Sequence, residues 1–298
     1  MSHTTRFITL GTAGGPVPKL HRAQPSHAIT RGDRVILIDC GEGAMQQLMR
    51  AGIDFRRVEK IILSHHHFDH IGSLFTCLGI NMMLQRKQPI TIYGPPGTRQ
   101  IVEGLAMACD VPQAIGFGVA GQSLPHPRDF VKVEEIDSGD TFEIDDIRIS
   151  CCENTHYRTE TELGTKGPIS LSLRFDAPDR SIVYTGDTGP CRMVENLAKG
   201  AQLLVCEMML AEQIIAQLQE KNPHMTSQRI AMVGQHLHSH HLSPEQLGDL
   251  AARAGVAHVV AVHIPLDSIT PETAPDFAAR ISQVFSGQVS IANDLDQF

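Results

Sequence analysis

The chain has 298 residues, of which 42% are hydrophobic and 19% are charged, so it is long enough to bury a full core. The net charge of −8 argues against a general affinity for nucleic acid, and no stretch approaches the roughly 20 apolar residues of a membrane span. The N-terminal residues carry no secretory signal, and the seven cysteines form no C-x-x-C pair. These features favour a cytoplasmic protein with reduced cysteines.

The first part of the chain alternates short apolar runs with helical patterns. The apolar runs predict strands at 6–10, 35–38, 58–63 and 90–93. The helical patterns predict helices at about 44–51, 73–85 and 98–109. Residues 111–129 contain Gly and Pro with few periodic apolar residues, which indicates a mobile loop.

The rest of the chain begins with a run of strands and then returns to alternation. Strands are predicted at 130–136, 141–144, 147–152, 170–175, 181–185, 203–206 and 259–262. Helices are predicted at 193–198, 211–219, 244–254 and 275–285, the third with Ser243 as N-cap and Gly255 as its stop. Strands followed by helices in both halves predict two sheets with helices outside. We therefore expect a four-layer α/β arrangement in one domain over residues 1–298.

A cluster of metal-binding residue types follows the strand at 58–63. His65, His67, Asp69 and His70 form the pattern H-x-H-x-D-H. Imidazole and carboxylate groups are common ligands of zinc, and a catalytic zinc keeps an open position. The cluster can therefore serve two neighbouring metal ions if other segments supply further ligands. A solvated His-rich loop is the alternative interpretation.

Further candidate ligands also follow strands. His156, Asp187 and His263 each come after an apolar run, whereas His241 precedes the helix at 244–254. His65 and His67 can hold one metal with His156, because alternate residues of an extended chain point the same way. Asp69 and His70 can hold a second metal with His263, and the Asp187 carboxylate can bridge both ions. A hydroxide between the metals is the expected nucleophile.

Other polar residues near these segments have subsidiary roles in this interpretation. Asp39, at the end of the strand at 35–38, can support a metal-binding histidine from behind, or it can form a turn before Gly41. His236, His238 and His240 are expected in a solvated loop or at a helix end rather than in a third metal site.

The order of the H-x-H-x-D-H cluster, His156, Asp187 and His263 resembles the metallo-β-lactamase-fold hydrolases over nearly the whole chain. The resemblance implies an αββα sandwich with a dinuclear zinc site between the sheets, and it agrees with the ligand sets above. Mn²⁺ or Fe²⁺ are alternatives to zinc, because affinity order and availability both matter.

A narrower resemblance is to the branch that holds tRNase Z and the metallo-type arylsulfatases. It is carried by the segments 10–15, 38–43, 93–95, 184–188, 204–207 and 241–245. The resemblance implies that Glu207 orients His241 and that His241 is the general acid. Asp69 would orient the attacking hydroxide.

The chain departs from tRNase Z at two places. The interval from His156 to Asp187 has no room for the tRNA-gripping arm of that family, and Ile-Pro-Leu-Asp follows His263. We therefore expect a hydrolase of a small ester (a phosphodiester, a sulfate ester or a lactone), with tRNA not expected as a partner. The alternatives are a β-lactam hydrolase, a tRNase Z-type endoribonuclease and a non-catalytic sensing protein of the same fold. A homodimer is compatible with the sequence.

Overall fold

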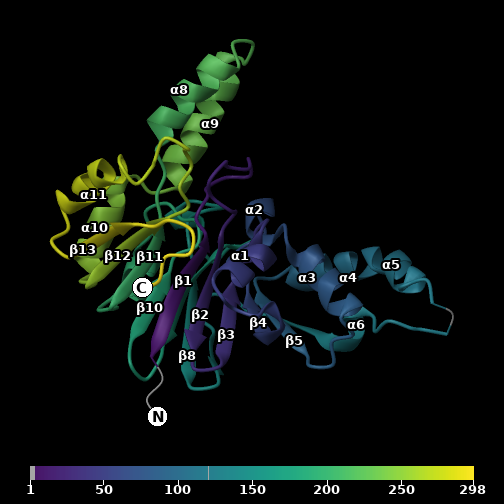
Figure 1. The fold of residues 1–298 in the computed structure, drawn as a ribbon. Helices are drawn as coiled ribbons and strands as arrows, with labels where there is room; N and C mark the ends of the chain where they lie inside the picture. The colour runs from purple at the N-terminus through teal and green to yellow at the C-terminus, as the bar shows by residue number, and fades with distance from the viewer. Residues whose placement is uncertain (1–3, 120) are drawn as a thin grey trace. The chain divides into compact units, whose positions relative to one another are not determined.

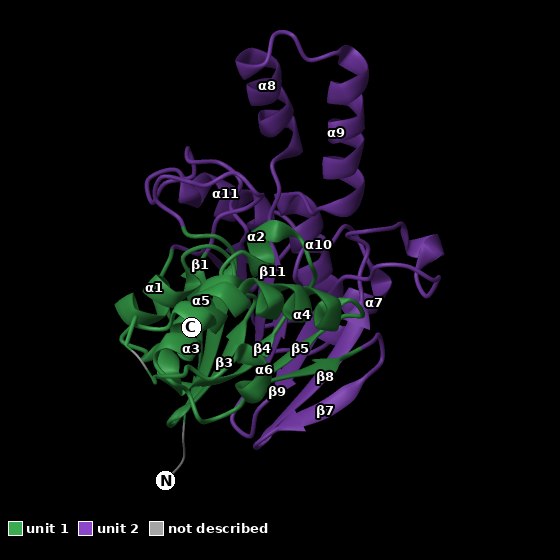
Figure 2. Cartoon of the chain, turned by 90° about the vertical axis from the view of Figure 1, so that its right-hand side faces the viewer, with its two compact units in different colours: residues 1–11, 23–136, 294–298 green, residues 12–22, 137–293 purple. Residues whose placement is uncertain are grey.

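The computed structural model describes residues 4–119 and 121–298 (Figure 1). The chain divides into two compact units, coloured separately in Figure 2. Unit 1 comprises residues 1–11, 23–136 and 294–298, and unit 2 comprises residues 12–22 and 137–293. Each unit contains one sheet with its own helices. In the described part of the chain, no helix has the length and apolar character needed to cross a membrane.

The sheet of unit 1 has six strands in the order β1-β2-β3-β4-β5-β6. The first three pair antiparallel, and β3 to β6 are parallel. The parallel strands leave their carboxyl ends at one edge, where loops carry the chemistry in α/β proteins. The strands are β1 Thr5–Gly11, β2 Ser26–Arg31, β3 Arg34–Ile38, β4 Val58–Ile62, β5 Ile90–Gly94 and β6 Val131–Glu135.

Alternate side chains of these strands form the core of unit 1. Leu37, Ile61 and Ile92 are fully buried and belong to the same cluster as Leu48 of α1 and Leu74 of α3. Ile36 and Ile62, on the other face of the strands, are buried as well, in keeping with the continuous apolar runs of parallel strands. The helices are α1 Ala44–Arg50, α2 Phe68–Ile71, α3 Leu74–Met83, α4 Thr98–Ala108, α5 Asp110–Ile115 and α6 Pro127–Phe130, with a 3₁₀ turn at Phe55–Arg57.

The sheet of unit 2 has seven strands in the order β13-β12-β11-β10-β9-β8-β7. Strands β7 to β10 pair antiparallel, whereas β10 to β13 are parallel. Polar residues that follow β10, β11 and β12 therefore emerge at the same edge. The strands are β7 Thr141–Ile144, β8 Ile147–Glu153, β9 Leu171–Asp176, β10 Ser181–Tyr184, β11 Leu203–Glu207, β12 His258–Val262 and β13 Gln288–Ile291.

Three helices cover the core of unit 2, and two more form a hairpin. Helices α7 Arg192–Ala198, α10 Pro244–Ala254 and α11 Ala274–Ser282 contribute to one buried cluster with the strands. Helices α8 Ala211–Lys221 and α9 Ser227–His240 lie side by side as an antiparallel pair inserted between β11 and α10 (Figures 1 and 2). A 3₁₀ turn lies at Glu160–Glu162.

The α/β class and most of the predicted elements are confirmed. Strands β2 and β13 and helix α9 were not predicted. The buried polar residues Ser26 and His27 hide the strand pattern of β2. Helix α9 has few apolar residues, and Gly234 allows its close approach to α8, since an added Cβ would lie 3.1 Å from Ile215.

The predicted loop at 111–129 is wrong at both ends. Residues 110–115 continue as α5, and 127–130 form α6 with the side chain of His126 as N-cap. Its mobility stays a prediction, and residue 120 lies outside the described residues.

The end of α10 depends on the backbone of Gly255, which has φ of 63°. We expect Gly255→Ala to lower the free energy of unfolding by about 1–2 kcal/mol, because a Cβ disfavours the left-handed region. An added Cβ there meets no atom within 4 Å, so the cost is conformational. Gly104→Ala in α4 is the control. Gly104 also has space for a Cβ and no positive φ, so this change should stabilise by about 0.5–1 kcal/mol. Urea titration measures both, and equal effects would contradict the argument.

Candidate metal centre

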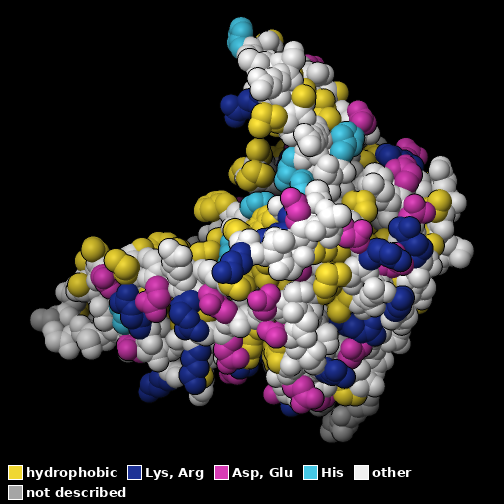
Figure 3. Space-filling model, turned by 180° about the vertical axis from the view of Figure 1, so that it is seen from behind, with side chains coloured by type: hydrophobic (Ala, Val, Ile, Leu, Met, Phe, Trp, Pro, Cys, Tyr) yellow, Lys and Arg dark blue, Asp and Glu magenta, His cyan; other side chains and the backbone are white. Residues whose placement is uncertain are grey.

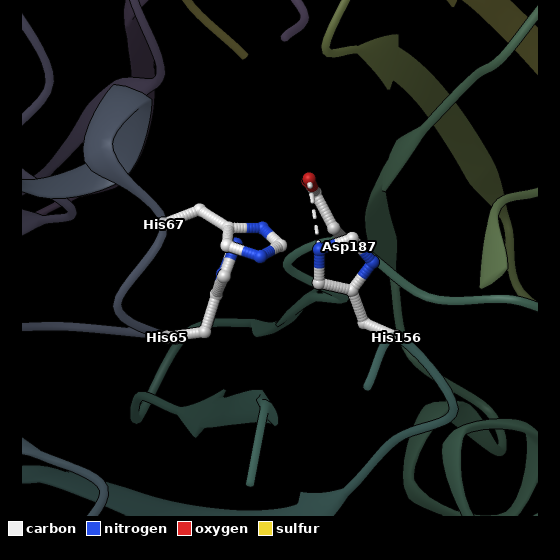
Figure 4. A group of neighbouring side chains, drawn as sticks. All are labelled: His65, His67, His156 and Asp187. Atoms are coloured by element: carbon white, nitrogen blue, oxygen red, sulfur yellow. Dashed lines mark ion pairs between the residues drawn. The ribbon is translucent and has the colours of Figure 1, made fainter. Parts of the chain in front are cut away.

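The H-x-H-x-D-H cluster lies where β4 ends in unit 1. His65 and His67 belong to the loop after the strand (Figure 4), and Asp69 and His70 lie in the short helix α2. His65, Asp69 and His70 are buried, whereas His67 is exposed. The ring centroids of His65 lie 4.9 Å from His67 and 4.0 Å from His70. His70 Nε2 lies 3.8 Å from the Asp69 carboxylate. Unit 1 therefore gathers all four predicted donors of this motif.

Asp39 holds the base of this loop. Its carboxylate accepts hydrogen bonds from the backbone N–H of Ser64 at 2.7 Å and from the Ser64 hydroxyl at 2.9 Å. It also contacts His70 Nδ1 at 2.8 Å, and both side chains have 0% exposure. A carboxylate on Nδ1 fixes the ring and leaves Nε2 for a metal. The predicted supporting contact between Asp39 and a histidine is thus present.

In unit 2, three predicted donors lie close together. Asp187 Oδ2 lies 3.7 Å from His156 Nε2, the ion pair drawn in Figure 4, and 3.1 Å from His263 Nε2. Asp187, His241 and His263 offer ligand atoms that all lie within 4.8 Å of one another. These three donors and His241 are all buried. Buried imidazole and carboxylate groups at this spacing have the chemistry of a zinc ligand set.

The contacts of the ring nitrogens test whether these residues fit a metal. Nδ1 of His65 contacts the Ser64 hydroxyl at 3.0 Å, and Nδ1 of His156 contacts the backbone oxygen of His240 at 3.2 Å. With the Asp39 contact to His70, three predicted ligands thus have Nδ1 engaged and direct Nε2 elsewhere. This is the usual second contact of a metal-binding histidine.

His263 is held differently. Its Nε2 accepts a hydrogen bond from the backbone N–H of Gly15 at 3.3 Å. Its φ of 57° and the φ of 54° at Asp39 are two of the few positive values at non-glycine residues in the described chain. Both residues follow a parallel strand directly. Such backbone strain gathers at functional sites, where the surroundings hold it in place.

The predicted pair of Glu207 and His241 is in contact. His241 Nδ1 lies 3.0 Å from both oxygens of the Glu207 carboxylate, which also accepts the backbone N–H of Thr188 at 2.8 Å. Glu207 is 1% exposed. Burial raises the pKa of Glu207, and the neighbouring His241 acts in the opposite direction. The bidentate contact fixes the imidazole plane and leaves Nε2 of His241 to face another group.

The histidines at the end of α9 differ in their surroundings: His236 and His238 are exposed, and His240 is partly buried. His240 Nδ1 contacts the backbone oxygen of Thr155 at 2.7 Å. The ring of His236 lies 5.4 Å from the ring of His241 and 6.0 Å from that of His156. His238 is exposed and faces Glu212 at 3.2 Å. The predicted placement of these histidines at a helix end is confirmed, and His240 is partly buried there. The sequence prediction missed helix α9, and with it the contacts of these histidines.

This fold and this set of buried donors at strand ends define a metal-dependent hydrolase. Residues 34–264 match the family model described as the Beta-lactamase superfamily domain, and the chain belongs to that superfamily. The predicted fold and family are therefore confirmed. The protein is a hydrolase that acts on ester bonds, as its relatives indicate.

The relatives cover almost the whole chain. The protein is 30% identical to a Ribonuclease Z of Mycolicibacterium gilvum over 97% of this chain and 94% of that protein. Among solved structures, the metallo-beta-lactamase fold protein YhfI from Bacillus subtilis has a TM-score of 0.71 at 17% identity, over 99% and 98% of the two chains. The short form of human tRNase Z has a TM-score of 0.65 at 19% identity, over 98% of each chain.

These relatives weaken the expectation that tRNA is not a partner. The short interval from His156 to Asp187 was the main sequence argument against tRNA. Yet the match spans 94% of a protein named Ribonuclease Z, so a long additional arm has little room in that relative as well. The interval by itself therefore does not separate this chain from ribonucleases Z.

The Asp39 contact predicts a change in metal binding. Asp39→Asn keeps the side-chain shape and tolerates the positive φ, but it removes the charge behind His70. We expect zinc affinity to fall by about 10–100-fold, measured by competition with a chromogenic chelator. Asp145→Asn is the matched control, since Asp145 has φ of 57° in the turn between β7 and β8. Unchanged zinc affinity in Asp39→Asn would contradict the supporting role.

Proposed function

We propose that the protein is a zinc-dependent phosphodiesterase that acts on a small substrate. The names of its relatives support phosphodiester chemistry, because a ribonuclease cleaves the phosphodiester backbone of RNA. The short distance between a positioned histidine and candidate metal ligands in unit 2 supports it from the structure.

The metal assignment in this proposal follows the sequence order. One zinc ion is assigned to His65, His67 and His156, and a second to Asp69, His70 and His263, with Asp187 as a ligand of both. The contacts within each unit support the donor character of that unit's own residues. Bound zinc would supply a water molecule of lowered pKa and would polarise the phosphoryl oxygens.

The buried Glu207–His241 pair is the observation on which the proposal depends. A phosphodiester breaks at a P–O bond, and the departing oxygen needs a proton unless it is already a good leaving group. Glu207 holds the His241 ring through Nδ1, so that a proton on Nε2 can be delivered in one direction. Asp187 and His263 lie on the same side of unit 2 as this ring. His241 is thus the proposed general acid, and Asp69 is proposed to orient the attacking water.

Cleavage of precursor tRNA at its 3′ end is the second candidate, favoured by the relatives named Ribonuclease Z. The α8–α9 hairpin is the projecting element of unit 2 (Figure 2). Its residues 211–240 contain two basic residues, Lys221 and Arg229, and two acidic residues, Glu212 and Glu220. This balanced charge gives little of the phosphate attraction on which RNA binding depends. The small substrate is therefore the leading proposal.

A substrate panel tests the two candidates together. Zinc-loaded protein should hydrolyse bis(nitrophenyl) phosphate well above nitrophenyl sulfate, a lactone and a chromogenic β-lactam. It should cleave a 3′-extended precursor tRNA poorly at physiological salt. Efficient and specific cleavage of that RNA would replace the small-substrate proposal, and preference for the sulfate, lactone or lactam would end the phosphodiesterase proposal.

His241→Ala tests the proton donor. We expect two zinc ions per chain to be retained, with kcat falling on the order of a hundredfold for diesters with poor leaving groups. For diesters with a nitrophenyl leaving group, kcat should fall much less, because nitrophenolate hardly needs a proton to depart. Equal losses for both substrate types would exclude general-acid catalysis. Loss of zinc, measured by elemental analysis, would instead make His241 a ligand, in keeping with its closeness to Asp187 and His263.

A further inference from the structure

An apolar pocket of about 320 Å³ lies within unit 2 beside the candidate site. It is enclosed by the loop 14–19, helix α8, the side chain of Leu237 on α9 and the segment 265–266 after β12. Its volume is at the lower end of ordinary ligand pockets, which span about 300–1,000 Å³. The proposed mechanism leaves this pocket without a role.

The inner end of the pocket adjoins proposed site residues. Gly15, in its wall, donates its backbone N–H to His263 at 3.3 Å. Met209, also in the wall, lies two residues after Glu207, and its N–H donates to the backbone oxygen of Leu242 at 2.8 Å. A molecule in the pocket would therefore extend from the region of His263 and His241. The loop passes close to His263, since a Cβ added at Gly14 would lie 2.4 Å from the backbone oxygen of His263. Only glycine fits at this position.

Most of the pocket is lined by apolar side chains, and its outer end is lined by two lysines. Ile214, Gln217, Leu218 and Lys221 line it from one face of α8. The seven residue steps from Ile214 to Lys221 correspond to about 10 Å of helix. Hydrophobic side chains gather along the flank of the hairpin at the top of Figure 3. Across from α8, Val17 also lines the pocket and is 65% exposed.

Two lysines from different segments meet at this outer end. Lys19 of the loop and Lys221 at the last turn of α8 both line the pocket. Burial lowers the pKa of Lys19, and Lys221 lowers it further, while Asp267 acts in the opposite direction. Asp267 also accepts the backbone N–H of Leu20 at 3.4 Å. With Asp267 beside Lys19, this end carries two ammonium groups and one carboxylate, and the remaining positive charge favours an anion.

We propose that this pocket binds the non-reacting arm of the substrate, an aryl or alkyl group of about 10 Å that ends in an anionic group held by Lys19 and Lys221. The inference rests on the proposed phosphodiesterase function and names its substrate class. The scissile diester lies at the inner end, the apolar arm lies along Leu218, and the terminal carboxylate, sulfonate or phosphate lies between the lysines. Such a substrate is an amphiphilic small molecule.

Binding is tested first with a pair of fluorescent probes that differ only in charge. These are 8-anilino-1-naphthalenesulfonate and N-phenyl-1-naphthylamine, which share one ring system. Leu218→Ser should weaken both probes about tenfold, because it removes apolar contact. Lys19→Gln with Lys221→Gln should weaken only the sulfonate, by about fivefold for each lysine. Met232→Ser is the matched control, since Met232 is 65% exposed on α9 and does not line the pocket.

Turnover is tested with nitrophenyl phosphodiesters whose second ester group is methyl, hexyl or carboxyhexyl. We expect kcat/KM to rise at least tenfold from methyl to hexyl and again from hexyl to carboxyhexyl. Leu218→Ser should remove the first rise, and the lysine variant should remove only the second. The methyl ester is the reference substrate for each variant, and Met232→Ser should keep both rises.

The outcomes separate this inference from the proposed function. If the wild-type protein hydrolyses none of the diesters, the phosphodiesterase proposal fails, and the probes alone decide whether the pocket binds an apolar anion. If the diesters are hydrolysed without dependence on the second ester group, the pocket is not a substrate pocket. If Met232→Ser changes probe binding as much as Leu218→Ser, the binding site lies elsewhere on the hairpin.

Discussion

The parallel register of β10, β11 and β12 is the constraint on which the chemistry of unit 2 depends. Tyr184 pairs with Val205, and Glu207 pairs with Val262. The carboxyl ends of these strands therefore lie at one edge, which brings together Glu207 at the end of β11, Asp187 after β10 and His263 after β12. A one-residue slip of β11 would turn Glu207 to the other face of the sheet and break its contact with His241. The apolar strands thus position polar groups at their carboxyl ends: Glu207 is the last residue of β11, and Asp187 and His263 follow β10 and β12.

The buried carboxylates of Glu207 in unit 2 and Asp39 in unit 1 each have hydrogen-bond partners in their own unit. The Glu207 carboxylate contacts His241 Nδ1 and accepts a hydrogen bond from the backbone N–H of Thr188. The Asp39 carboxylate accepts a hydrogen bond from the backbone N–H of Ser64 and contacts His70 Nδ1. Burying a carboxylate without such partners would be costly. The same contacts that make burial tolerable also fix the ring planes of the histidines. Stability and preorganisation therefore come from one set of hydrogen bonds in each unit.

The α8–α9 hairpin links the two proposals for this protein. Helix α9 ends at His240, whose backbone oxygen contacts His156 Nδ1. Helix α8 begins at Ala211, four residues after Glu207. The proposed substrate recognition along α8 and the contacts at the base of α9 thus belong to one inserted element. A family that keeps the sheet and its donors can change its substrate by changing this insertion, because loops and insertions tolerate variation that the core does not.

The sequence alone determined the α/β class, most strands and helices, and the candidate donors, because apolar periodicity and the H-x-H-x-D-H spacing are local signals. It also indicated that Asp39 supports a histidine and that Glu207 meets His241, the second through family resemblance. Only the tertiary structure decided the contacts of His236 and His240 and the apolar pocket with Lys19 and Lys221. These depend on the packing of α9 against α8 and on residues some 200 positions apart, which no local pattern encodes. Helix α9 itself stays largely exposed, and Gly234, at its contact with α8, is its one buried residue in the described chain.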